Sequence, residues 1–364
     1  MNKNLPKWVD LGLIPVLTLL LAFAVSGLVV LSIGQDPIEV VKVMLNGAFN
    51  PYGIGHTLYF TTNFIFTGLA VAVAFHAKLF NIGGEGQAGI AGVGVALVML
   101  SYDWPHWSIA LLVGTIAAMA FGAAWAAIPA YLQAKRGSHI VITTIMFNLI
   151  GSALIGYLVV GPMQGEGSQP QSERFPSSAS LPDFHEIFGW FGLEFAKHAP
   201  ANISFFIALI AAVLVWILIW KTRLGYEMRA FGHSEKAAVY AGISPLKITM
   251  IAMLVSGALS GLMAVNTVQG DAERLLLGSV EGAGFIGIAV ALMGRSHPVG
   301  VLLAAFLFGI LTQGGAELQF ELGIPAQMIT VIQALIIMFT GSLENLVRIP
   351  MERLFIRAGK GATS

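Results

Sequence analysis

Two acidic residues stand beside glycines in otherwise apolar stretches of the chain. Glu85 lies in the run 83–86, of sequence GGEG, and Glu281 opens the similar run 281–284, of sequence EGAG. If these stretches cross a bilayer, each carboxylate costs about 2.5–3.5 kcal/mol on insertion scales, so it should be paired or face water or a transport path. The simpler interpretation places Glu85 at a helix N-terminus, which favours negative charge, and Glu281 at a solvated membrane interface.

Uncharged polar side chains follow one face of a later apolar stretch. Thr144, Asn148 and Ser152 are spaced by four residues and so share one face of a helix. Asn63 and Thr67 repeat that spacing earlier in the chain. Because lipid disfavours an amide side chain, such a face should point into the protein, where it either hydrogen-bonds between helices or lines a substrate path. The candidate substrate-path residues are Glu85, Gln87, Asn63, Asn148, Thr144 and Glu281.

The familiar catalytic and cofactor motifs do not occur or lack their context. The chain has no cysteine, which excludes disulfides, thiolate metal sites and cysteine nucleophiles. Its 8 histidines form no H-E-x-x-H pair, so no metal site is expected, and neither a G-x-S-x-G elbow nor a P-loop occurs. A G-x-G-x-x-G match at 282–287 opens an apolar run, where glycines serve helix packing rather than dinucleotide binding. The sequence therefore indicates neither an enzyme nor a chain with its own ATP site.

The composition is typical of a membrane protein. Of the 364 residues, 56% are hydrophobic and 10% are charged, whereas about 25% of residues are charged in soluble domains. The apolar residues suffice for about ten spans of ~20 residues each. This composition excludes a soluble enzyme and a disordered chain. Acidic and basic residues are equal in number, 19 of each, so the net charge gives no reason to expect a nucleic-acid partner.

We predict an all-α integral membrane protein with about ten transmembrane helices in a single domain, residues 1–364. The nearly charge-free runs are 11–33, 57–76, 79–101, 108–132, 139–161, 201–220, 248–269, 275–294, 299–316 and 325–342. Both the N-terminus and the C-terminus are placed in the cytoplasm, because this orientation leaves only four of the 19 basic residues outside. These four are Lys42, Arg174, Lys197 and Arg274.

Two of the predicted spans are candidates for interruption. The run 79–101 contains the GGEG sequence near its start, and the run 275–294 carries Glu281 about seven residues along a helix. Broken helices of this kind line the path of many transporters. The order of the spans also permits an inverted repeat of spans 2–5 and 7–10, in which the two glycine-rich starts would correspond.

Two connecting segments are longer than the rest. Residues 162–199 form an extracytoplasmic loop rich in Gly, Ser, Pro and Gln, to which the sequence assigns no role. Residues 221–247 form a cytoplasmic loop that carries helix signals. Ser234 is a favourable N-cap, Glu235 suits a first helical turn, and Gly242 suits the position after a helix end. A helix of about two turns is therefore predicted at residues 234–241.

Three groups of residues resemble the permease subunits of bacterial ABC importers of the branched-chain amino acid/ribose type. They are FNIGGEGQ at 80–87; RAFG at 229–232, followed by AA at 237–238, AGI at 241–243 and SGALSG at 256–261; and GFIGIAVALMG at 284–294. The resemblance runs from about residue 55 to residue 345. The first and third groups look most like the simple sugar and nucleoside subgroup, the guanosine-type importers.

The resemblance implies a permease that works by alternating access and translocates a nucleoside or a simple sugar across the bacterial inner membrane. Separate ATPase subunits would bind ATP and Mg, so no cofactor is expected in this chain. The other implied partners are a second homologous permease, in a homodimer or a heterodimer, a periplasmic or lipid-anchored substrate-binding protein and the lipid bilayer.

The resemblance also implies a role for the predicted cytoplasmic helix, because in such permeases a short helix docks in the ATPase. The coupling residues would be Ser234, Glu235, Ala237, Ala238, Ala241 and Gly242, with Ala238 on the docking face. Two alternatives stay open. Glu85 and Glu281 motivate a proton- or sodium-coupled secondary transporter, and a membrane enzyme acting on lipid is a third hypothesis, without a catalytic constellation to support it.

Overall fold

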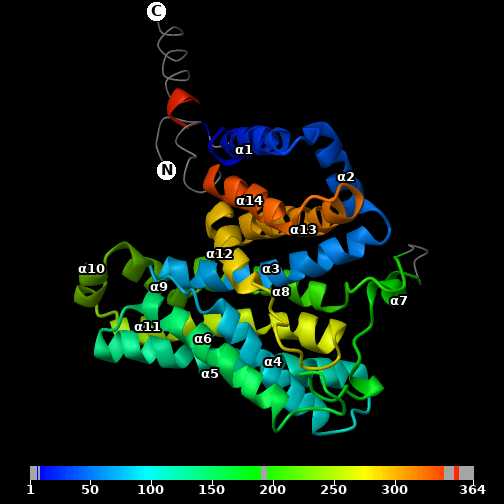
Figure 1. Ribbon diagram of the computed structural model, residues 1–364. Helices are drawn as coiled ribbons and strands as arrows, with labels where there is room; N and C mark the ends of the chain where they lie inside the picture. The colour runs from blue at the N-terminus through cyan, green and yellow to red at the C-terminus, as the bar shows by residue number, and fades with distance from the viewer. Residues whose placement is uncertain (1–5, 7–8, 190–194, 340–347, 352–364) are drawn as a thin grey trace, which may run out of the picture. The chain divides into compact units, whose positions relative to one another are not determined.

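The computed structural model describes residues 6, 9–189, 195–339 and 348–351. Within these ranges the chain consists of helices, turns and loops, with two isolated β-bridges (Figure 1). It divides into two compact units, one formed by Phe49–Gly309 and the other by Met1–Ala48 together with Ile310–Ser364. The predicted all-α fold is confirmed, whereas the single domain and the inverted repeat stay predictions.

The larger unit carries most of the helices. In chain order these are α3 (Gly53–His76), α4 (Gly84–Leu100), α5 (Trp107–Arg136), α6 (Ile140–Val160), the 3-10 helix η2 (Ser177–Ala179), α7 (Phe184–Gly189), α8 (Ser204–Lys221), α9 (Arg223–His233), α10 (Glu235–Tyr240), α11 (Pro245–Gly261), the π-helix η3 (Val265–Asp271) and α12 (Ala283–Met293). Helix α13 (Pro298–Glu321) begins in this unit and ends in the other. The smaller unit also holds the π-helix η1 (Val9–Leu13), α1 (Ile14–Ser32), α2 (Pro37–Phe49) and α14 (Ala326–Ile337).

Each of the ten predicted spans contains an apolar helix. Seven helical stretches are long and apolar enough to cross a membrane, namely Ile14–Ser32, Gly53–His76, Trp107–Arg136, Ile140–Val160, Ser204–Lys221, Pro245–Asp271 and Pro298–Glu321. Shorter apolar helices at Gly84–Leu100, Ala283–Met293 and Gln327–Ile336 occupy the other three spans. The sequence did not predict α2, which has 13 residues. The end of the last predicted span, beyond residue 339, lies outside the described residues, as do most residues of both termini.

In the two predicted spans with glycine-rich starts, the helix begins later than the span. Helix α4 begins only after residues 79–83, which are not helical. Residues 275–282 form turns before α12, and Gly278 and Gly282 adopt φ angles of +83° and +79° there. Such left-handed conformations break a helix and favour glycine. Glu281 is therefore an exposed turn residue, which corrects its placement seven residues into a helix.

Small residues let the central helices of the larger unit approach closely. Helix α11 packs against α5, where a Cβ atom at Gly122 would overlap the carbonyl oxygen of Gly257. Helix α12 packs against α3, where a Cβ atom at Gly287 would overlap Thr67. Helix α3 is buried along most of its length, whereas α5, α6 and α8 expose much of their apolar surface. Close contacts between small residues are typical of membrane helix bundles.

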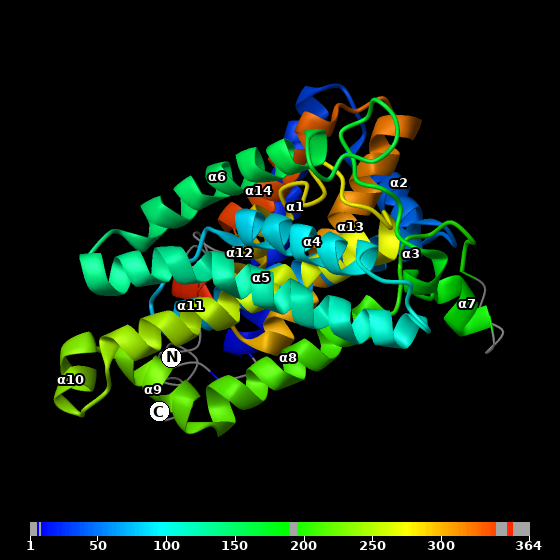
Figure 2. The same cartoon turned by 90° about the horizontal axis from the view of Figure 1, so that it is seen from below.

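The two long loops lie at opposite ends of the larger unit. Figures 1 and 2 show α9 and α10 at one end of this unit and α7 at the other. The 221–247 loop contains α9, which the sequence did not predict, as well as the predicted α10. The 162–199 loop contains η2 and α7 and is joined to later residues by β-bridges, Gln171 with Leu276 and Asp183 with Asn202.

Candidate functional site

Glu85 joins the N-termini of two helices. Its Oε1 atom accepts a hydrogen bond from the backbone nitrogen of Gly282 at 2.9 Å, and its Oε2 atom accepts one from Gly284 at 3.0 Å. Both N–H groups lie at the start of α12, where a helix has no internal partners for them. Glu85 itself lies in the first turn of α4, and a Cβ atom at Gly284 would overlap its backbone. The two glycine-rich starts therefore meet, and the carboxylate of one helix caps the other.

Asn148 on α6 caps α4 in turn. Its Oδ1 atom accepts a hydrogen bond from the backbone nitrogen of Gly86 at 2.9 Å, and its Nδ2 atom donates to the carbonyl oxygen of Ile82 at 2.8 Å. Asn148 is only 7% exposed and so points into the protein, whereas Ser152 on the same predicted face is exposed. Thr144 is also buried, but its hydroxyl donates to the Ile140 carbonyl of its own helix at 2.8 Å. Of the two, Asn148 fixes the start of α4.

Gln87 is held in a pair of buried amides. Asn81 and Gln87 exchange two side-chain hydrogen bonds, of 2.9 and 3.1 Å. Asn81 also accepts from the Gly83 backbone nitrogen at 2.9 Å and donates to the Ser256 hydroxyl at 2.8 Å. Buried polar groups require such partners. Asn81 thus holds the non-helical residues 79–83 in place. This role of Asn81 was not predicted from the sequence, although an asparagine two residues before a glycine is a turn signal.

Asn63 takes part in a separate buried network. Its Oδ1 atom accepts a hydrogen bond from Asn266 Nδ2 at 2.8 Å. The Asn266 Oδ1 atom in turn accepts from the Asn202 amide at 2.9 Å and from the Ser204 hydroxyl at 2.8 Å. This network joins α3, η3 and the start of α8. The structure therefore groups Glu85, Gln87 and Asn148 around the start of α4, and it shows Asn63 and Thr144 in other contacts.

A small pocket opens beside Glu85, between α4, α6 and the turns that precede α12. Its volume is about 70 Å³, whereas sites that enclose a whole drug-sized ligand measure about 300–1,000 Å³. The residues that line it are Glu85, Gly86, Gly89, Asn148, Ser152, Ile155 and residues 276–280. Glu281 is not among them. The pocket can therefore hold only part of a small organic molecule.

The 162–199 loop is joined to the segment that forms one wall of this pocket. The Ser172 backbone nitrogen donates to the Leu275 carbonyl oxygen at 3.0 Å, and the Leu275 backbone nitrogen donates to the Ser172 hydroxyl at 2.9 Å. Arg174 forms an ion pair with Glu273. Residues 273–275 lead directly into the pocket wall at 276–280. The loop to which the sequence assigned no role thus fixes this wall.

Asp183 lies in the same loop, beside other acidic residues. Burial raises the pKa of its carboxyl group from 3.8 to about 6. The negative charges of Glu186, Glu273 and Asp271 add to the rise, and His185 opposes it. A group with this pKa changes its charge between mildly acidic and neutral pH.

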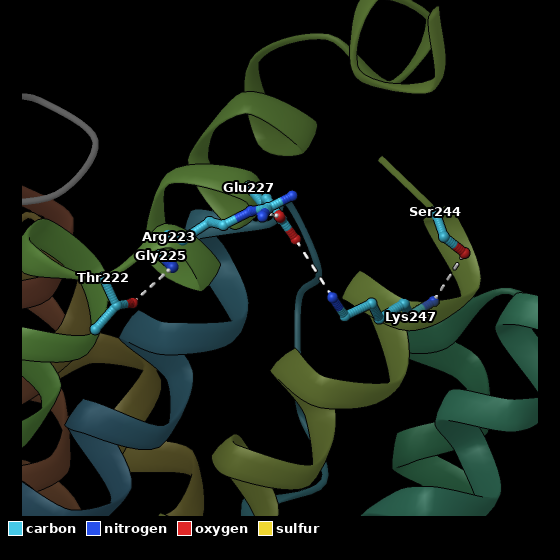
Figure 3. Close-up of polar contacts among 6 residues, drawn as sticks. All are labelled: Thr222, Arg223, Gly225, Glu227, Ser244 and Lys247. Carbon is cyan, nitrogen blue, oxygen red and sulfur yellow. Dashed lines mark hydrogen bonds and ion pairs between the residues drawn. The ribbon is translucent and has the colours of Figure 1, made fainter. Parts of the chain in front are cut away.

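The α9–α11 segment is built from capped and cross-linked helices (Figure 3). At the start of α9 the Thr222 hydroxyl accepts a backbone hydrogen bond at 3.1 Å, and at the start of α11 the Ser244 hydroxyl accepts one at 3.4 Å. Glu227 on α9 forms ion pairs with Arg223 at 2.9 Å and with Lys247 at 3.7 Å. The second ion pair connects α9 with α11.

Helix α10 ends where the sequence predicted. Ser234 is its N-cap and accepts a backbone hydrogen bond at 3.4 Å, and Gly242 has a φ angle of +84° after its last turn. The side of the helix that faces outward differs from the expectation. Ala238 is only 3% exposed and packs against its own chain, whereas Tyr240 is 97% exposed. The other predicted coupling residues, Ser234, Glu235, Ala237, Ala241 and Gly242, are exposed.

The large apolar side chains that α10 exposes are Val239 and Tyr240. Neither residue was predicted from the sequence as a contact residue. The available signal was the presence of two large apolar residues in a polar loop. Such residues, when they lie on the surface, often mark a contact with a partner.

Helix α9 contacts the end of α3. A Cβ atom at Gly232 would overlap the carbonyl oxygen of His76. The Lys78 ammonium donates to the carbonyl oxygen of His233 at 3.5 Å, and Lys78 has a φ angle of +54°, which is uncommon for a residue with a side chain. Residues 79–83 follow directly. Lys78 thus contacts the end of α9, and only residues 79–83 lie between Lys78 and the start of α4.

Known proteins resemble this chain over nearly its whole length. A family model described as the permease component of the branched-chain amino acid transport system matches residues 53–341. The glucose ABC transporter permease protein of Haloferax volcanii is 34% identical over 364 residues, covering 99% of this chain and 95% of that one. The guanosine ABC transporter permease protein of Bacillus subtilis is 36% identical over 334 residues, covering 91% and 93%. The nucleoside ABC transporter permease protein of Lactococcus lactis is 34% identical over 334 residues, covering 90% of each.

Proposed function

Because this chain belongs to the family of branched-chain amino acid transport permease components, it is a multi-pass inner-membrane subunit of an ABC importer, and we propose that it translocates a nucleoside or a simple sugar. The observation that carries the substrate class is the 34–36% identity, over nine-tenths or more of the chain, to permeases named for glucose, guanosine and nucleosides. Subunits of this family are transport components rather than enzymes.

The family implies an ATPase and a substrate-binding protein as partners. We propose in addition a second, related permease subunit, in a homodimer or a heterodimer, and a binding protein that is periplasmic or lipid-anchored. ATP and Mg would be bound by the ATPase. The small pocket at Glu85 supports the proposal of a second permease subunit. One chain encloses only about 70 Å³ there, so it would supply only one side of a substrate path.

The 221–247 loop is the proposed contact with the ATPase, on the cytoplasmic side of the membrane together with both termini. Helix α10 is capped at its start and exposes Tyr240. Helix α9 is tied to α11 by the ion pair between Glu227 and Lys247 and contacts the end of α3. A displacement of α10 would therefore pass to residues 79–83 and the start of α4 through directly contacting segments.

The proposed path runs past Glu85 at the meeting point of α4 and α12. Short or broken helices whose N-termini meet at the substrate site are a recurring feature of transporters. In this proposal Asn148, Gln87, Thr144 and Asn63 position helices, because their polar groups are already paired within the protein. Of the predicted path residues, Glu85 is half-buried and contacts the starts of both helices.

A proton- or sodium-coupled transporter was considered because Glu85 and Glu281 were expected within membrane spans, and the structure does not support this expectation for Glu281. Glu281 is an exposed turn residue rather than an acid within a membrane helix. Both oxygens of Glu85 already accept hydrogen bonds from the start of α12. Glu85 thus serves as the cap of α12, and Glu281 does not lie within a span.

Reconstitution tests the proposed function. The chain, a partner permease, the ATPase and the binding protein are placed in liposomes, and the uptake of labelled guanosine and of labelled glucose is measured. We expect ATP to drive uptake of one of them, and an ATPase variant without its P-loop lysine to abolish it. Uptake that continues without ATP and stops with a protonophore would support a secondary transporter. ATP-driven uptake of neither compound would overturn the substrate class.

A further inference from the structure

We propose that the pocket beside Glu85 is a subsite for the hydroxyl groups of an uncharged substrate, and that the Glu85 carboxylate and the Ser152 hydroxyl determine its specificity. This inference rests on the proposed function, because it names the part of a nucleoside or sugar that the permease itself recognises. It assigns to the permease a selection step separate from that of the binding protein.

The Glu85 carboxylate keeps unused acceptor capacity where it lines the pocket. Each oxygen accepts one backbone hydrogen bond from the start of α12, whereas a carboxylate offers about four acceptor positions. The two backbone contacts hold the carboxylate in one orientation before a ligand arrives. An acceptor that is already oriented binds a donor at a smaller entropic cost. The pocket is therefore suited to a ligand that carries O–H donors.

Ser152 supplies a hydroxyl group from α6, and Ser279 lines the same pocket from the turns before α12. Ser152 follows Asn148 by one turn of α6 and is exposed. Among the described residues, none forms a hydrogen bond with its hydroxyl. A serine hydroxyl both donates and accepts, so it complements a ligand hydroxyl. Asn148 also lines the pocket, with one acceptor position and one N–H donor already used on the start of α4.

The remaining wall disfavours an anionic ligand. It consists of Gly86, Gly89, Ile155 and residues 276–280, and in the part of the chain that the structure describes no lysine, arginine or histidine lines the pocket. A phosphate group would meet the Glu85 carboxylate without a counter-charge, which is unfavourable where water is scarce. The edge of a sugar ring instead places its hydroxyls on Glu85 and Ser152 and its C–H groups against the two leucines of the wall.

The test compares substrates that differ by one hydroxyl group, in the reconstituted transporter with wild-type chain or Ser152→Ala. Uptake kcat/KM is measured for guanosine and its 2′-deoxy and 3′-deoxy forms, or for glucose and its single-deoxy forms if glucose is the transported compound. The same binding protein delivers every ligand, so its preference cancels when the two chains are compared. Removing the contacted hydroxyl from the substrate should lower kcat/KM in both proteins. We expect this loss to be about five-fold larger in the wild-type chain than in Ser152→Ala, which corresponds to one hydrogen bond.

Thr143→Ala is the matched control on the same helix, because the Thr143 hydroxyl donates to carbonyl groups of α6 and does not line the pocket. It should keep the wild-type preference among the deoxy forms. If the wild-type chain transports and Ser152→Ala keeps that preference for every deoxy form, the inference is overturned and the proposed function stands. If the wild-type chain transports neither guanosine nor glucose, the proposed function fails and the subsite fails with it.

Discussion

The start of α4 and the α9–α11 segment are stabilised in opposite ways. At the start of α4, Glu85 and Asn148 direct their polar atoms to backbone groups of other segments. In the α9–α11 segment, Ser234 caps its own helix, and Glu227 forms an ion pair with Lys247, whose side chain is exposed. An unpaired buried group costs about 1–3 kcal/mol, whereas an exposed ion pair contributes about 0–1 kcal/mol. The first region therefore depends on single side chains, and the second tolerates their loss.

The largest effect on stability is expected for Glu85→Ala. This change leaves the N–H groups of Gly282 and Gly284 without their carboxylate partner, and we expect the free energy of unfolding to fall by about 2–4 kcal/mol. Thermal unfolding of the purified chain in detergent measures it. Glu281→Ala is the control, since an exposed turn residue should change stability by less than about 0.5 kcal/mol. Equal effects of the two changes would contradict the difference between the regions.

Asn148→Ala should have the next largest effect. It removes the hydrogen bonds to Gly86 and Ile82 together, and we expect a loss of about 1–3 kcal/mol because the Gly86 N–H is buried. Thr143→Ala should stay close to wild type, because its hydroxyl only repeats bonds within α6. A stable Asn148→Ala protein would mean that α4 does not depend on this cap.

The same difference explains what could be predicted from sequence. The limits of α10 follow from Ser234 and Gly242, which act on neighbouring residues and so leave a local pattern. Glu85 acts on Gly282 and Gly284, which lie 197 and 199 residues further along the chain. No local pattern identifies such partners, although the two glycine-rich starts could be recognised as breaks in their helices.

Burial within α10 could not be predicted either. Ala238 and Tyr240 are two residues apart in a helix of six residues, and their 3% and 97% exposures depend on how α10 packs against the rest of the chain. The same holds for Ser172, whose partner Leu275 lies 103 residues away. Local signals thus gave the apolar helices and the caps of α10, but not α2 or α9, and tertiary packing determined which side chains meet.

A smaller, pH-dependent effect is expected in the 162–199 loop. The pKa of Asp183 is about 6 in the folded protein, above its ordinary value of 3.8, because of burial and the acids Glu186, Glu273 and Asp271, with His185 opposing. The folded state thus binds this proton more tightly than the unfolded state. The contribution of Asp183 to the free energy of unfolding is therefore greatest below about pH 4, and it is lost as the pH rises through about 6. Partial exposure limits the loss to about 1–2 kcal/mol.

Thermal unfolding at pH 5 and pH 7 measures this effect. Asp183→Asn should lose less stability than the wild-type chain over this interval, because it has no carboxyl group to ionise at this position. An identical loss in both proteins would assign the pH dependence to other groups.

The smallest effect on stability is expected for the ion pair between α9 and α11. Lys247→Ala should cost less than about 1 kcal/mol, because the lysine is exposed and the 3.7 Å contact is screened by water and salt. Unfolding at low and high salt should show the wild-type advantage decreasing as salt rises. A loss as large as that of Glu85→Ala would show that the α9–α11 segment, too, depends on a single side chain.

The central claim is that the α9–α11 end of the larger unit faces the cytoplasm and binds the ATPase. The chain has no cysteine, so Tyr240→Cys introduces a single thiol at a position that is 97% exposed. The decisive measurement is the rate at which an impermeant thiol reagent modifies this variant in inside-out membrane vesicles, with and without the ATPase subunit. We predict rapid modification without the ATPase and strong protection with it. Modification at the same rate in both cases, or only in vesicles of the opposite orientation, would contradict the account.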